Sequence, residues 1–580
     1  MGTKIALKPE NWKVEKIAVV GAGIVGVPIA AALAGTKIHL GSESPARVVV
    51  VQRDSLTSGW KVAAINAGRS PVGGIEPGLD KLIAQSSVEG RLRASSDYTE
   101  VRDADAVLVC VQTDRSGYEP EYGPLKEAVA KIGQELQKRP REKIPVVIFE
   151  STLAPTTMTT VIKADFARFG LVDGRDILLG NSPNRVMSGH LLERIRSSDK
   201  IIGGFLPETR ELISALYSKI VTQASLHMTN SLTAEVVKTL ENAYRDVRIA
   251  YAAEIARFCD ENNIDFHEVR REVNKRLDWD DQAAENWPIV PSGGLLVPTI
   301  GVGGHCLPKD GILLLWRRIE SGCDMSGSLI LEARRINDES PAFAVSRMEK
   351  LFGGVSGKPI ALLGTAYRSD SEDTRNSPAL ALGCLLIQRG CQVSVHDPYV
   401  KPDDQNLAKS GLARFFTRDV EKALKAADIL VFSTAHQIYR EGWDQIRRWL
   451  PRPPKIFDGC NLFSRSSFPE KSLSYEGIGK GIFRPPAELV DFVHLGFLAM
   501  EKGFANETQE LIDFFNAHYV RDDYERLHFE VIQKLAATCA TGCYIVPPEH
   551  VAALPEYKGF YSRLAERAHR SSAGRKGRVQ

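Results

Sequence analysis

The feature that most constrains the fold of this chain is a short apolar run that leads directly into a glycine-rich turn. Residues 16–20, KIAVV, precede Gly21, Gly23 and Gly26 in the spacing G-x-G-x-x-G, and apolar residues then continue at helical spacing through PIAAALA. A strand, a tight turn and a helix in this order are typical of dinucleotide-binding folds, because glycine lets the backbone approach a pyrophosphate that the helix N-terminus stabilises. The alternative is a glycine turn that only packs the helix on the strand.

Strand-like apolar runs recur along the chain, with helical segments between them. The N-terminal part carries them at 48–51, 106–113 and 145–152, and after about residue 345 they restart at 358–367, 391–398, 427–435 and 455–461. Strands that alternate with helices predict parallel sheets. We therefore expect an α/β protein with two Rossmann-like domains.

A different pattern separates these two parts. Residues 233–262 contain neither Pro nor Gly, and their apolar residues recur every three to four positions, which predicts one long central helix. A helix of this length is expected to span between domains or to support a dimer interface. The predicted organisation is a dinucleotide-binding Rossmann domain at 1–222, a central helical region at 223–345, a second Rossmann-like domain at 346–481 and a helical extension of unknown role at 482–580.

The C-terminal extension has helical apolar patterns but no motif that assigns it a role. Its large apolar side chains include Phe492, Phe497, Phe504, Phe514 and Phe515. Burial of such a side chain is worth roughly 1.5–3 kcal/mol. We therefore expect these side chains to pack on the body of the protein, on a second subunit or on one another.

Charge and composition argue against several classes of protein. The 74 basic and 72 acidic residues leave a net charge of +2, which gives no support for binding to nucleic acid or to a membrane surface. No run approaches 18 uncharged apolar residues, and the first residues lack the apolar core of a signal peptide. The nine cysteines are scattered, as expected for reduced thiols. These features predict a cytoplasmic protein.

The residue expected to bind the adenosine ribose follows the second predicted strand. It is Gln52, and Arg53 comes next. An acid here would favour NAD by binding the ribose 2′-hydroxyl and by repelling a 2′-phosphate. Gln52 repels no phosphate, and Arg53 either attracts one or points to solvent. We expect NAD as the cofactor and leave NADP open.

A second glycine-rich segment, GVGGHCLPKD at 301–310, surrounds a single cysteine. Its glycines allow the backbone to come close to a ligand. The basic residues His305 and Lys309 lie near Cys306 in the sequence and favour the thiolate, the reactive form of cysteine. We therefore interpret Cys306 as a nucleophile rather than as a structural cysteine.

At this loop the chain resembles the UDP-glucose/GDP-mannose dehydrogenase family, which includes UDP-N-acetylhexosamine 6-dehydrogenases. The resemblance runs from about residue 16 to about residue 481 and depends on the order of several segments. They are GAGIVG (21–26), NAGRSPVGGIEPGL (66–79), GRLRASSDY (90–98), ESTLAP (150–155), AEVVKTLENAYRDVRIAYAAE (234–254), GVGGHCLPKD (301–310), ARRINDESP (333–341), GTAYRSDSEDTRNSP (364–378) and VHDP (395–398). The resemblance implies an N-terminal NAD domain, a central helix used for dimerisation and a C-terminal nucleotide-sugar domain, in a homodimer or higher homo-oligomer.

The resemblance also implies a reaction. The family oxidises the C6 alcohol of a nucleotide sugar in two hydride transfers, through an aldehyde that the cysteine captures and a thioester that water hydrolyses to the uronate. By motif position, Cys306 is the nucleophile. Lys238 and Asn242, one helical turn apart, would contact the substrate and the developing oxyanion. Asp310 would assist water activation or proton transfer, and Thr152 would lie near the reacting water and the nicotinamide.

Binding residues carry over in the same way. Those implied for the cofactor are Gly21, Gly23, Ile24, Val25, Gly26, Gln52, Arg53, Val111, Thr113, Thr152, Lys309 and Arg375. Those implied for the nucleotide sugar are Arg185, Lys238, Asn242, Arg245, Gly303, Gly304, Tyr367 and Arg368. No metal site is expected.

Several positions depart from the family pattern. Asn184 stands where the family usually has the glutamate of an SPERV-type loop, its favoured general base, and an amide accepts no proton at neutral pH. Cys460 replaces an arginine that helps to bind the charged part of the substrate. Arg368 replaces a lysine, which keeps the charge but changes the hydrogen-bonding shape.

The signals for the substrate branch conflict. Arg185 in SPNRV and His305 resemble the N-acetylhexosamine branch, whereas Lys309 and Asp310 resemble the UDP-glucose and GDP-mannose branches. Three functions stay open: a dehydrogenase that makes a nucleotide-linked uronate, the same fold releasing the aldehyde after one oxidation, and a non-catalytic nucleotide-sugar-binding scaffold.

Overall fold

The structure is a computed structural model that describes residues 7–55, 58–73, 76–140, 143–185, 189–279, 293–450, 455–468, 474–539, 543–549, 557, 560 and 562–576. The chain folds into two compact units. The first unit gathers Met1–Glu241, Ile312–Cys323 and Glu510–Tyr544. The second gathers Asn242–Gly311, Asp324–Gln509 and Ile545–Gln580. Both units therefore combine segments that are far apart in the sequence.

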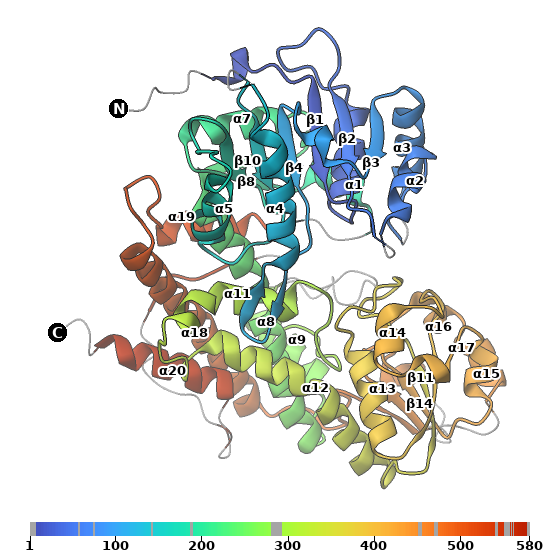
Figure 1. The fold of residues 1–580 in the computed structure, drawn as a ribbon. Helices are drawn as coiled ribbons and strands as arrows, with labels where there is room; N and C mark the ends of the chain where they lie inside the picture. The colour runs from blue at the N-terminus through green and yellow to red at the C-terminus, as the bar shows by residue number, and fades with distance from the viewer. Residues whose placement is uncertain are drawn as a thin grey trace. The chain divides into compact units, whose positions relative to one another are not determined.

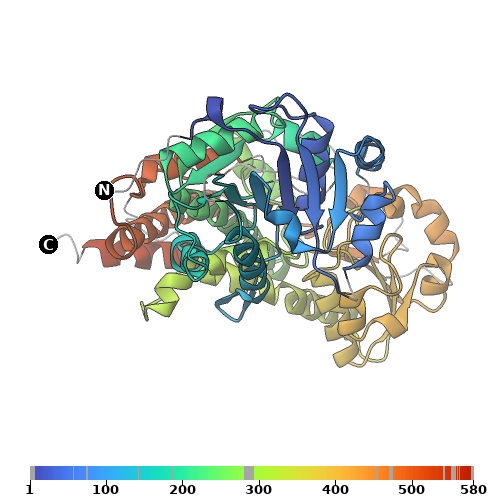
Figure 2. The same ribbon diagram turned by 45° about the horizontal axis from the view of Figure 1, so that its top comes forward.

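The first unit is built on an eight-stranded sheet in the order β10-β9-β8-β7-β4-β1-β2-β3 (Figure 1 and Figure 2). Its strands are β1 (Lys16–Val20), β2 (Arg47–Val51), β3 (Leu92–Ser95), β4 (Ala106–Val109), β7 (Val146–Phe149), β8 (Leu178–Asn181), β9 (Lys200–Gly204) and β10 (Leu226–Asn230). All neighbours are parallel except β8 and β9. The order β3-β2-β1-β4 is that of dinucleotide-binding sheets, which place the ligand at the carboxyl ends of the strands.

Helices cover both faces of this sheet, which explains why its strands are apolar throughout rather than alternating. Ile17 and Val19 of β1 share one core with α1 (Gly26–Gly35), α3 (Leu79–Val88) and α7 (Pro207–Tyr217). Ala18 and Val20 belong to a second core with α4 (Gly123–Leu136), η3 (Met158–Ile162) and α5 (Lys163–Ala167). The remaining elements are η1 (Pro9–Asn11), α2 (Trp60–Asn66), η2 (Tyr98–Val101), the antiparallel pair β5 (Asp114–Ser116) and β6 (Glu119–Glu121), and α6 (Leu191–Ser197).

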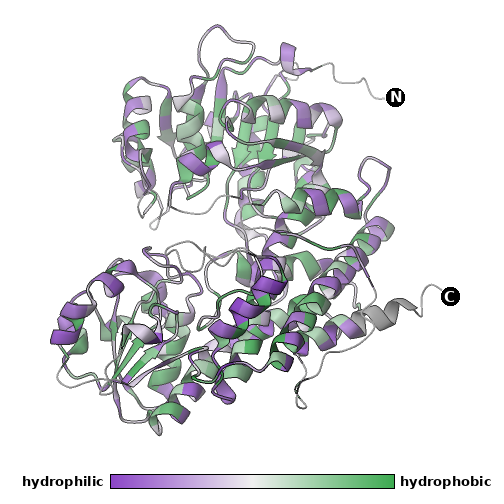
Figure 3. Ribbon diagram, turned by 180° about the vertical axis from the view of Figure 1, so that it is seen from behind, coloured by the Kyte–Doolittle hydropathy of each residue, from purple (hydrophilic) through white to green (hydrophobic). Residues whose placement is uncertain are grey.

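The second unit contains a six-stranded parallel sheet in the order β13-β12-β11-β14-β15-β16. Its strands are β11 (Pro359–Leu363), β12 (Gln392–His396), β13 (Phe416–Thr417), β14 (Ile429–Phe432), β15 (Lys455–Asp458) and β16 (Ser474–Gly477). The hydropathy colouring of Figure 3 shows hydrophobic strands in this sheet, as expected from the apolar sequences of β11 and β14. The flanking elements are α13 (Pro378–Gln388), α14 (Gln405–Lys409), η4 (Ala413–Phe415), α15 (Val420–Leu424), α16 (Gln437–Glu441), α17 (Trp443–Arg448) and η5 (Arg465–Ser467). The predicted α/β class with two Rossmann-like sheets is confirmed.

The predicted long helix is α8 (Ser231–Glu261), which runs from the first unit into the second. In the second unit its apolar side is covered by α18 (Ala487–His518) of the C-terminal extension. Tyr251 Oη donates to the Val493 carbonyl over 2.8 Å, and the rings of Tyr244 and Phe504 lie 5.2 Å apart. This apolar side of α8 is thus buried within one chain, and the dimer stays a prediction.

The extension packs on the body of the protein in both units. In the second, the Glu507 carboxylate of α18 accepts from Ser328 Oγ and from the Leu329 and Ile330 amides, at the start of α12 (Leu329–Phe352). In the first, Asn230 Nδ2 at the end of β10 donates to the Tyr524 carbonyl over 2.9 Å. Further helices are α9 (Phe266–Arg276), α11 (Leu307–Glu320), α19 (Phe529–Ala537) and α20 (Arg563–Lys576). Among the described residues, no helix is both long and apolar enough to cross a membrane.

Candidate active site

The glycine turn in the first unit has the geometry of a dinucleotide-binding turn. Gly21 has φ +112°, and a Cβ there would lie 2.6 Å from the Cys110 carbonyl oxygen. A Cβ on Gly26, the first residue of α1, would lie 2.0 Å from the Gly21 carbonyl oxygen. At Gly23 a Cβ would meet no atom within 4 Å. The outer glycines are therefore required by the turn itself, while Gly23, which lies beside the half-buried Ile24 and Val25, borders open space.

Gln52, the residue predicted to bind the adenosine ribose, points toward this turn. Its Oε1 accepts the Ala22 amide over 2.8 Å, and its Nε2 donates to Ser58 Oγ over 3.0 Å. The amide oxygen therefore makes a backbone contact that a carboxylate could also make. Arg53 does not point to empty solvent, because its Nη1 pairs with Glu127 Oε2 at 3.1 Å on the surface. An exposed pair of this kind is worth about 0–1 kcal/mol, but it places a negative charge beside Arg53.

The remaining cofactor positions of the first unit lie at the carboxyl ends of β4 and β7. Thr113 Oγ1 donates to the Thr152 carbonyl over 2.6 Å, and Ser151 Oγ donates to the Val111 carbonyl over 2.5 Å. The first unit thus joins the two loops that carry Val111, Thr113 and Thr152. β4 is the direct neighbour of β1, the strand that leads into the glycine turn.

Arg185 is buried rather than open to a substrate. It forms an ion pair with Glu241, and the two side chains are only 4% and 2% exposed. Burial raises the pKa of the Glu241 carboxyl, and the attraction of Arg185 and then of Lys238 opposes this rise. Sequence reasoning missed Glu241, although its position directly before Asn242 on the central helix was a signal. Lys238 is also buried, at 7% exposure.

The guanidinium of Arg185 has all of its donors engaged by the protein. An arginine carries five N–H groups. Arg185 donates to both Glu241 carboxylate oxygens, to the carbonyls of Asp199 and Leu535, and to Thr538 Oγ1. Direct binding of a nucleotide sugar by Arg185, as the resemblance implies, would require one of these contacts to break.

Asn184 precedes Arg185 and is half-buried at the start of its loop. Its amide donates to the Glu150 carbonyl over 3.1 Å. The Glu150 carboxylate itself is buried and accepts from Lys200 Nζ over 3.0 Å and from the Tyr217 hydroxyl. Asn184, Arg185, Lys200 and Tyr217 line a small pocket of the first unit. The Glu150 carboxylate is therefore engaged by Lys200 and Tyr217, whereas the Asn184 amide donates to the Glu150 backbone.

Another buried acid of α8 holds the loop that follows Thr152. The Glu235 carboxylate accepts the amides of Thr156 and Met158 over 2.8 and 2.9 Å. Burial raises the pKa of Glu235 to about 8, against these hydrogen bonds and the attraction of Arg317. Thr156 has φ +79°, a left-handed conformation that side chains rarely adopt, so Glu235 stabilises a strained turn.

In the second unit, Cys306 is exposed and directly precedes α11. Its carbonyl accepts the Asp310 amide over 2.9 Å, the first hydrogen bond of the helix. The free amides and the dipole at a helix N-terminus favour negative charge nearby. Cys306 therefore lies at the end of α11 where a negatively charged group is favoured.

The glycines of the cysteine loop allow close packing against the segment that carries Tyr367 and Arg375. A Cβ on Gly303 would lie 2.5 Å from Tyr367 Cβ, and one on Gly304 would lie 2.9 Å from the Tyr367 ring. The Gly304 amide donates to the Arg375 carbonyl over 2.8 Å. The pKa of Arg375 is raised by its hydrogen bond to Asp373 first and by the Cys306 thiol among lesser causes. Arg375, predicted to bind the cofactor, is thus a cation close to Cys306.

Asp310 and Asn242 also come together in the second unit. Asn242 Nδ2 donates to Asp310 Oδ2 over 2.6 Å, and Lys309 Nζ pairs with Asp310 Oδ1. Asp310 is fully buried and Lys309 is 3% exposed. The charge of Lys309, expected beside the thiol, is therefore directed to Asp310. Arg245 lies in the same part of α8 and is half-buried.

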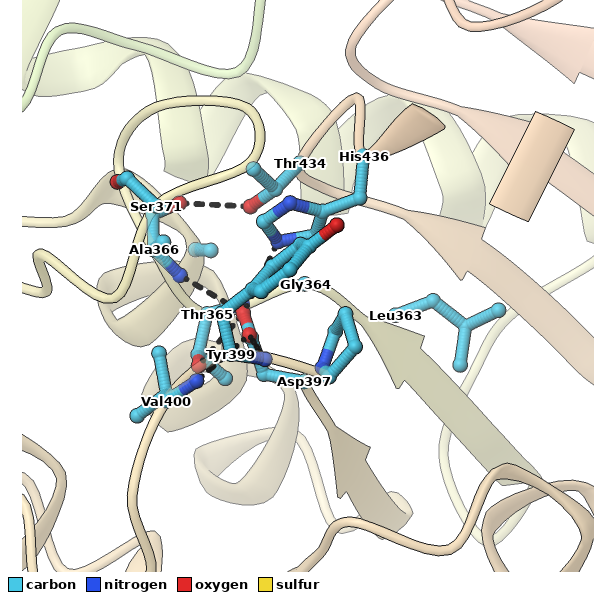
Figure 4. A network of polar contacts seen from close by, with 12 residues as sticks. Leu363, Gly364, Thr365, Ala366, Ser371, Asp397, Tyr399, Val400, Thr434 and His436 are labelled. Atoms are coloured by element: carbon cyan, nitrogen blue, oxygen red, sulfur yellow. Dashed lines mark hydrogen bonds and ion pairs between the residues drawn. The ribbon is translucent and has the colours of Figure 1, made fainter. Parts of the chain in front are cut away.

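The second Rossmann-like sheet has its own acid at the ribose-like position, and that acid fills the turn after β11 (Figure 4). The Asp397 carboxylate accepts the amides of Thr365 and Ala366 over 2.7 and 3.1 Å. His436 Nε2 lies 3.1 Å from it. Burial alone would raise the pKa of Asp397, but the hydrogen bonds from His436 and the amides hold it below its ordinary value. The backbone amides of the turn after β11 are thus bound by the Asp397 carboxylate.

The two remaining departures lie elsewhere in the second unit. Cys460 follows β15, and its thiol lies 3.7 Å from Asp458 Oδ1. Burial raises the pKa of the Cys460 thiol, and Asp458 adds to the rise. Arg368, next to Tyr367, is half-buried. Among the described residues, no group of three or more His, Cys, Asp or Glu side chains has an arrangement that would hold a metal ion.

Known proteins resemble this chain over most of its length. The UDP-N-acetyl-D-mannosamine dehydrogenase of Pyrococcus horikoshii is 30% identical over 471 residues, covering 80% of this chain and 99% of the relative. The NDP-N-acetyl-D-galactosaminuronic acid dehydrogenase of Ralstonia nicotianae is 30% identical over 436 residues, covering 73% and 92%. The solved P. horikoshii UDP-D-ManNAc dehydrogenase has a TM-score of 0.66 at 30% identity, covering 80% of this chain and 99% of that one.

Family sequence models match three successive parts of the chain. The NAD binding domain of the UDP-glucose/GDP-mannose dehydrogenase family matches residues 15–221, its central domain matches 232–339, and its UDP binding domain matches 361–465. The resemblance found in the sequence motifs is confirmed. The chain therefore belongs to the UDP-glucose/GDP-mannose dehydrogenase family.

Proposed function

We propose that this protein is an NAD-dependent nucleotide-sugar 6-dehydrogenase that oxidises the C6 alcohol of a UDP-N-acetylhexosamine to the uronate through a thioester on Cys306. The observation that carries the proposal is the position of Cys306, exposed at the N-terminus of α11, in the same unit as the Asn242–Asp310 hydrogen bond. A cysteine that served only the fold would be expected in the interior, as Cys259 is.

The first unit fits NAD. The open space at Gly23, the amide contact of Gln52 and the N-terminus of α1 supply the pyrophosphate and ribose positions. Glu127 beside Arg53 disfavours the extra phosphate of NADP, because like charges repel. When bound, NAD would accept a hydride from C6 of the sugar. Each uronate formed requires two hydride transfers, and therefore two molecules of NAD.

The side chains of the protein supply the remaining chemistry. The Cys306 thiolate adds to the aldehyde carbon, and the carbonyl oxygen takes up a proton, which gives a thiohemiacetal. Loss of a hydride from C6 and a proton from its hydroxyl leaves the thioester. Water then displaces the thiolate and leaves the carboxylate. Lys238 and the Asn242 amide stabilise the oxyanion, and Asp310 orients Asn242 and exchanges protons with the reacting water.

The choice of a UDP-N-acetylhexosamine is supported by the relatives. Those with about 30% identity are named as UDP-N-acetyl-D-mannosamine and NDP-N-acetyl-D-galactosaminuronic acid dehydrogenases. The test is NADH formation with UDP-N-acetyl-D-mannosamine, UDP-N-acetyl-D-glucosamine, UDP-N-acetyl-D-galactosamine, UDP-glucose and GDP-mannose, with NADP as the alternative cofactor. Faster turnover of UDP-glucose or GDP-mannose would contradict the proposed substrate class.

A second candidate activity is release of the aldehyde after one oxidation. The observation in its favour is Asn184, which cannot act as the base for thioester hydrolysis. The ratio of NADH formed to nucleotide sugar consumed separates the candidates. A ratio of two supports the uronate, a ratio of one supports the aldehyde, and no NADH with any sugar of the panel would favour a binding scaffold.

A further inference from the structure

The C-terminal extension reaches the loop that carries Asn184, inside the first unit. The last turn of α19 lies against Arg185: Arg185 Nη1 donates to Thr538 Oγ1 over 2.8 Å, and Nη2 donates to the Leu535 carbonyl over 3.4 Å. The Cys539 side chain also lies close to Arg185 and Glu241. Residues more than 340 positions further along the chain therefore complete the contacts of this arginine.

The Thr538 hydroxyl accepts, rather than donates, the hydrogen bond with Arg185. Thr538 Oγ1 donates its own hydrogen to the Leu535 carbonyl over 2.7 Å, so its lone pairs are left to accept from Arg185. Thr538 is the C-cap of α19, where the unpaired carbonyls and the helix dipole favour a cation. Hydrogen bonds to a charged group are among the stronger ones in proteins. The end of α19 is therefore a built acceptor site for the Arg185 guanidinium.

The same arginine links this helix end to residues of the proposed reaction. Its guanidinium also pairs with Glu241, which is adjacent to Asn242 on α8. The positive charge of Lys238 lowers the pKa of the Glu241 carboxyl, against the effect of burial. On the chain Arg185 follows Asn184, whose amide is held by the Glu150 carbonyl. The extension segment itself is anchored independently, because Tyr524 Oη donates to the Gly204 carbonyl over 3.1 Å and Asn230 binds the Tyr524 carbonyl.

We propose that the C-terminal turn of α19 is a positioning element of the enzyme, in which Thr538 and the Leu535 carbonyl hold Arg185 and thereby orient the Asn184 loop and the Glu241–Lys238 part of α8. This inference rests on the proposed dehydrogenase function. Thr538 is proposed as a positioning residue that does not itself contact the substrate. It acts through Arg185, whose donors are all engaged by the protein, so the expected effect is on turnover rather than on sugar affinity.

The test compares Thr538→Val, which keeps the shape and removes the hydroxyl, with Thr538→Ser, which keeps the hydroxyl. Thr508→Val is the matched control, because Thr508 is a buried threonine of the extension whose hydroxyl also donates to a helix carbonyl, that of Phe504. Thr508 is not among the residues to which the Arg185 guanidinium donates. We expect Thr538→Val to lower kcat about tenfold, since small misplacements in an active site are costly. The KM for NAD and the melting temperature should match those of the control, and Thr538→Ser should restore kcat.

Hydrogen exchange of the backbone amides at Asn184 and Arg185 provides a second measurement that needs no turnover. Faster exchange there in Thr538→Val, but not in Thr538→Ser or Thr508→Val, is expected. Unchanged exchange would overturn the positioning role, and faster exchange with unchanged kcat would overturn its importance for the reaction. An equal loss of kcat in Thr508→Val would reduce Thr538 to a general folding role. If the unchanged protein oxidises no nucleotide sugar, the proposed function fails and the catalytic part of the inference fails with it, whereas the exchange data still decide whether α19 holds the loop.

Discussion

Replacing Glu501 by glutamine is expected to change how the stability of the protein depends on pH. Glu501 lies on α18, and its carboxylate accepts from Tyr244 Oη over 3.1 and 2.9 Å, with Arg248 Nε 3.7 Å away. Burial raises the pKa of Glu501 from 4.5 to about 7, against the attraction of Arg248 and the hydrogen bond from Tyr244. Glutamine keeps an acceptor for Tyr244 and removes the titration.

The sign follows from proton linkage. Between pH 4.5 and about 7 the folded protein holds the Glu501 proton while the unfolded chain has lost it. Folding therefore takes up a proton in this range, and the contribution of Glu501 to stability falls as the pH rises, then stays constant above the folded pKa. Because one pKa unit corresponds to 1.36 kcal/mol, the fall amounts to about 3 kcal/mol. Glu501→Gln lacks this term, so its stability relative to the unchanged protein should improve by up to about 3 kcal/mol between pH 4.5 and pH 8.

The assay is urea unfolding followed by tryptophan fluorescence at half-unit steps from pH 4.5 to pH 8. Glu488→Gln is the matched control, because Glu488 is an exposed glutamate on the same helix. The difference between each variant and the unchanged protein isolates the substituted group from all other titrations. If the Glu501→Gln and Glu488→Gln differences run parallel across this pH range, the buried-carboxylate argument is wrong.

Three further predictions concern the reaction and the extension. Cys306→Ala should form no uronate yet bind the nucleotide sugar with unchanged Kd in calorimetry, and uronate formation by this variant would exclude the thioester route. Asn184→Glu should restore a base and speed thioester hydrolysis, by about 10²-fold if Asn184 limits turnover; quenched mass spectra should show a Cys306 adduct in the unchanged protein that this variant lacks, and an adduct equal in both would refute the role of Asn184. Deletion of 487–580 should expose the α8 side that α18 covers and cause aggregation in light scattering, whereas a soluble, active truncated protein would show that α8 needs no such cover.

Much of the fold follows from local patterns in the sequence. The apolar runs predicted four strands of each sheet, β1, β2, β4 and β7 in the first and β11, β12, β14 and β15 in the second, and the absence of Pro and Gly predicted α8. Both signals are local, because an apolar run and a 3.6-residue period each lie within a single element. The strands β3, β8, β9, β10, β13 and β16 were found only in the structure. The glycine spacing placed the dinucleotide turn, since its backbone geometry is a local property. The helical apolar patterns of the extension that include Phe492 and Phe515 belong to one helix, α18. The sequence pattern alone did not show that they form a single helix.

The candidate site was predicted in its residue types but not in its contacts. Cys306, Asn242 and Asp310 were identified from motifs, and the second unit brings Asn242 and Asp310 together. The direction of a charged side chain depends on which partner is nearest in the folded chain. Lys309 was expected beside the thiol and pairs with Asp310 instead, while Arg375, from a distant segment, supplies a cation near Cys306.

By itself, the sequence determined that the chain builds two Rossmann-like sheets, a long central helix and a glycine-rich cysteine loop, because turn chemistry and apolar period are written in neighbouring residues. Tertiary structure alone decided that α18 covers α8, that Asp397 closes the second turn and that Arg185 is held by Glu241 and Thr538. These contacts join residues up to about 350 positions apart. A buried charge must be paired, and its partner is whichever group the folded chain brings within reach. The periodic pattern of apolar residues along the sequence carries no information about which distant residue becomes that partner.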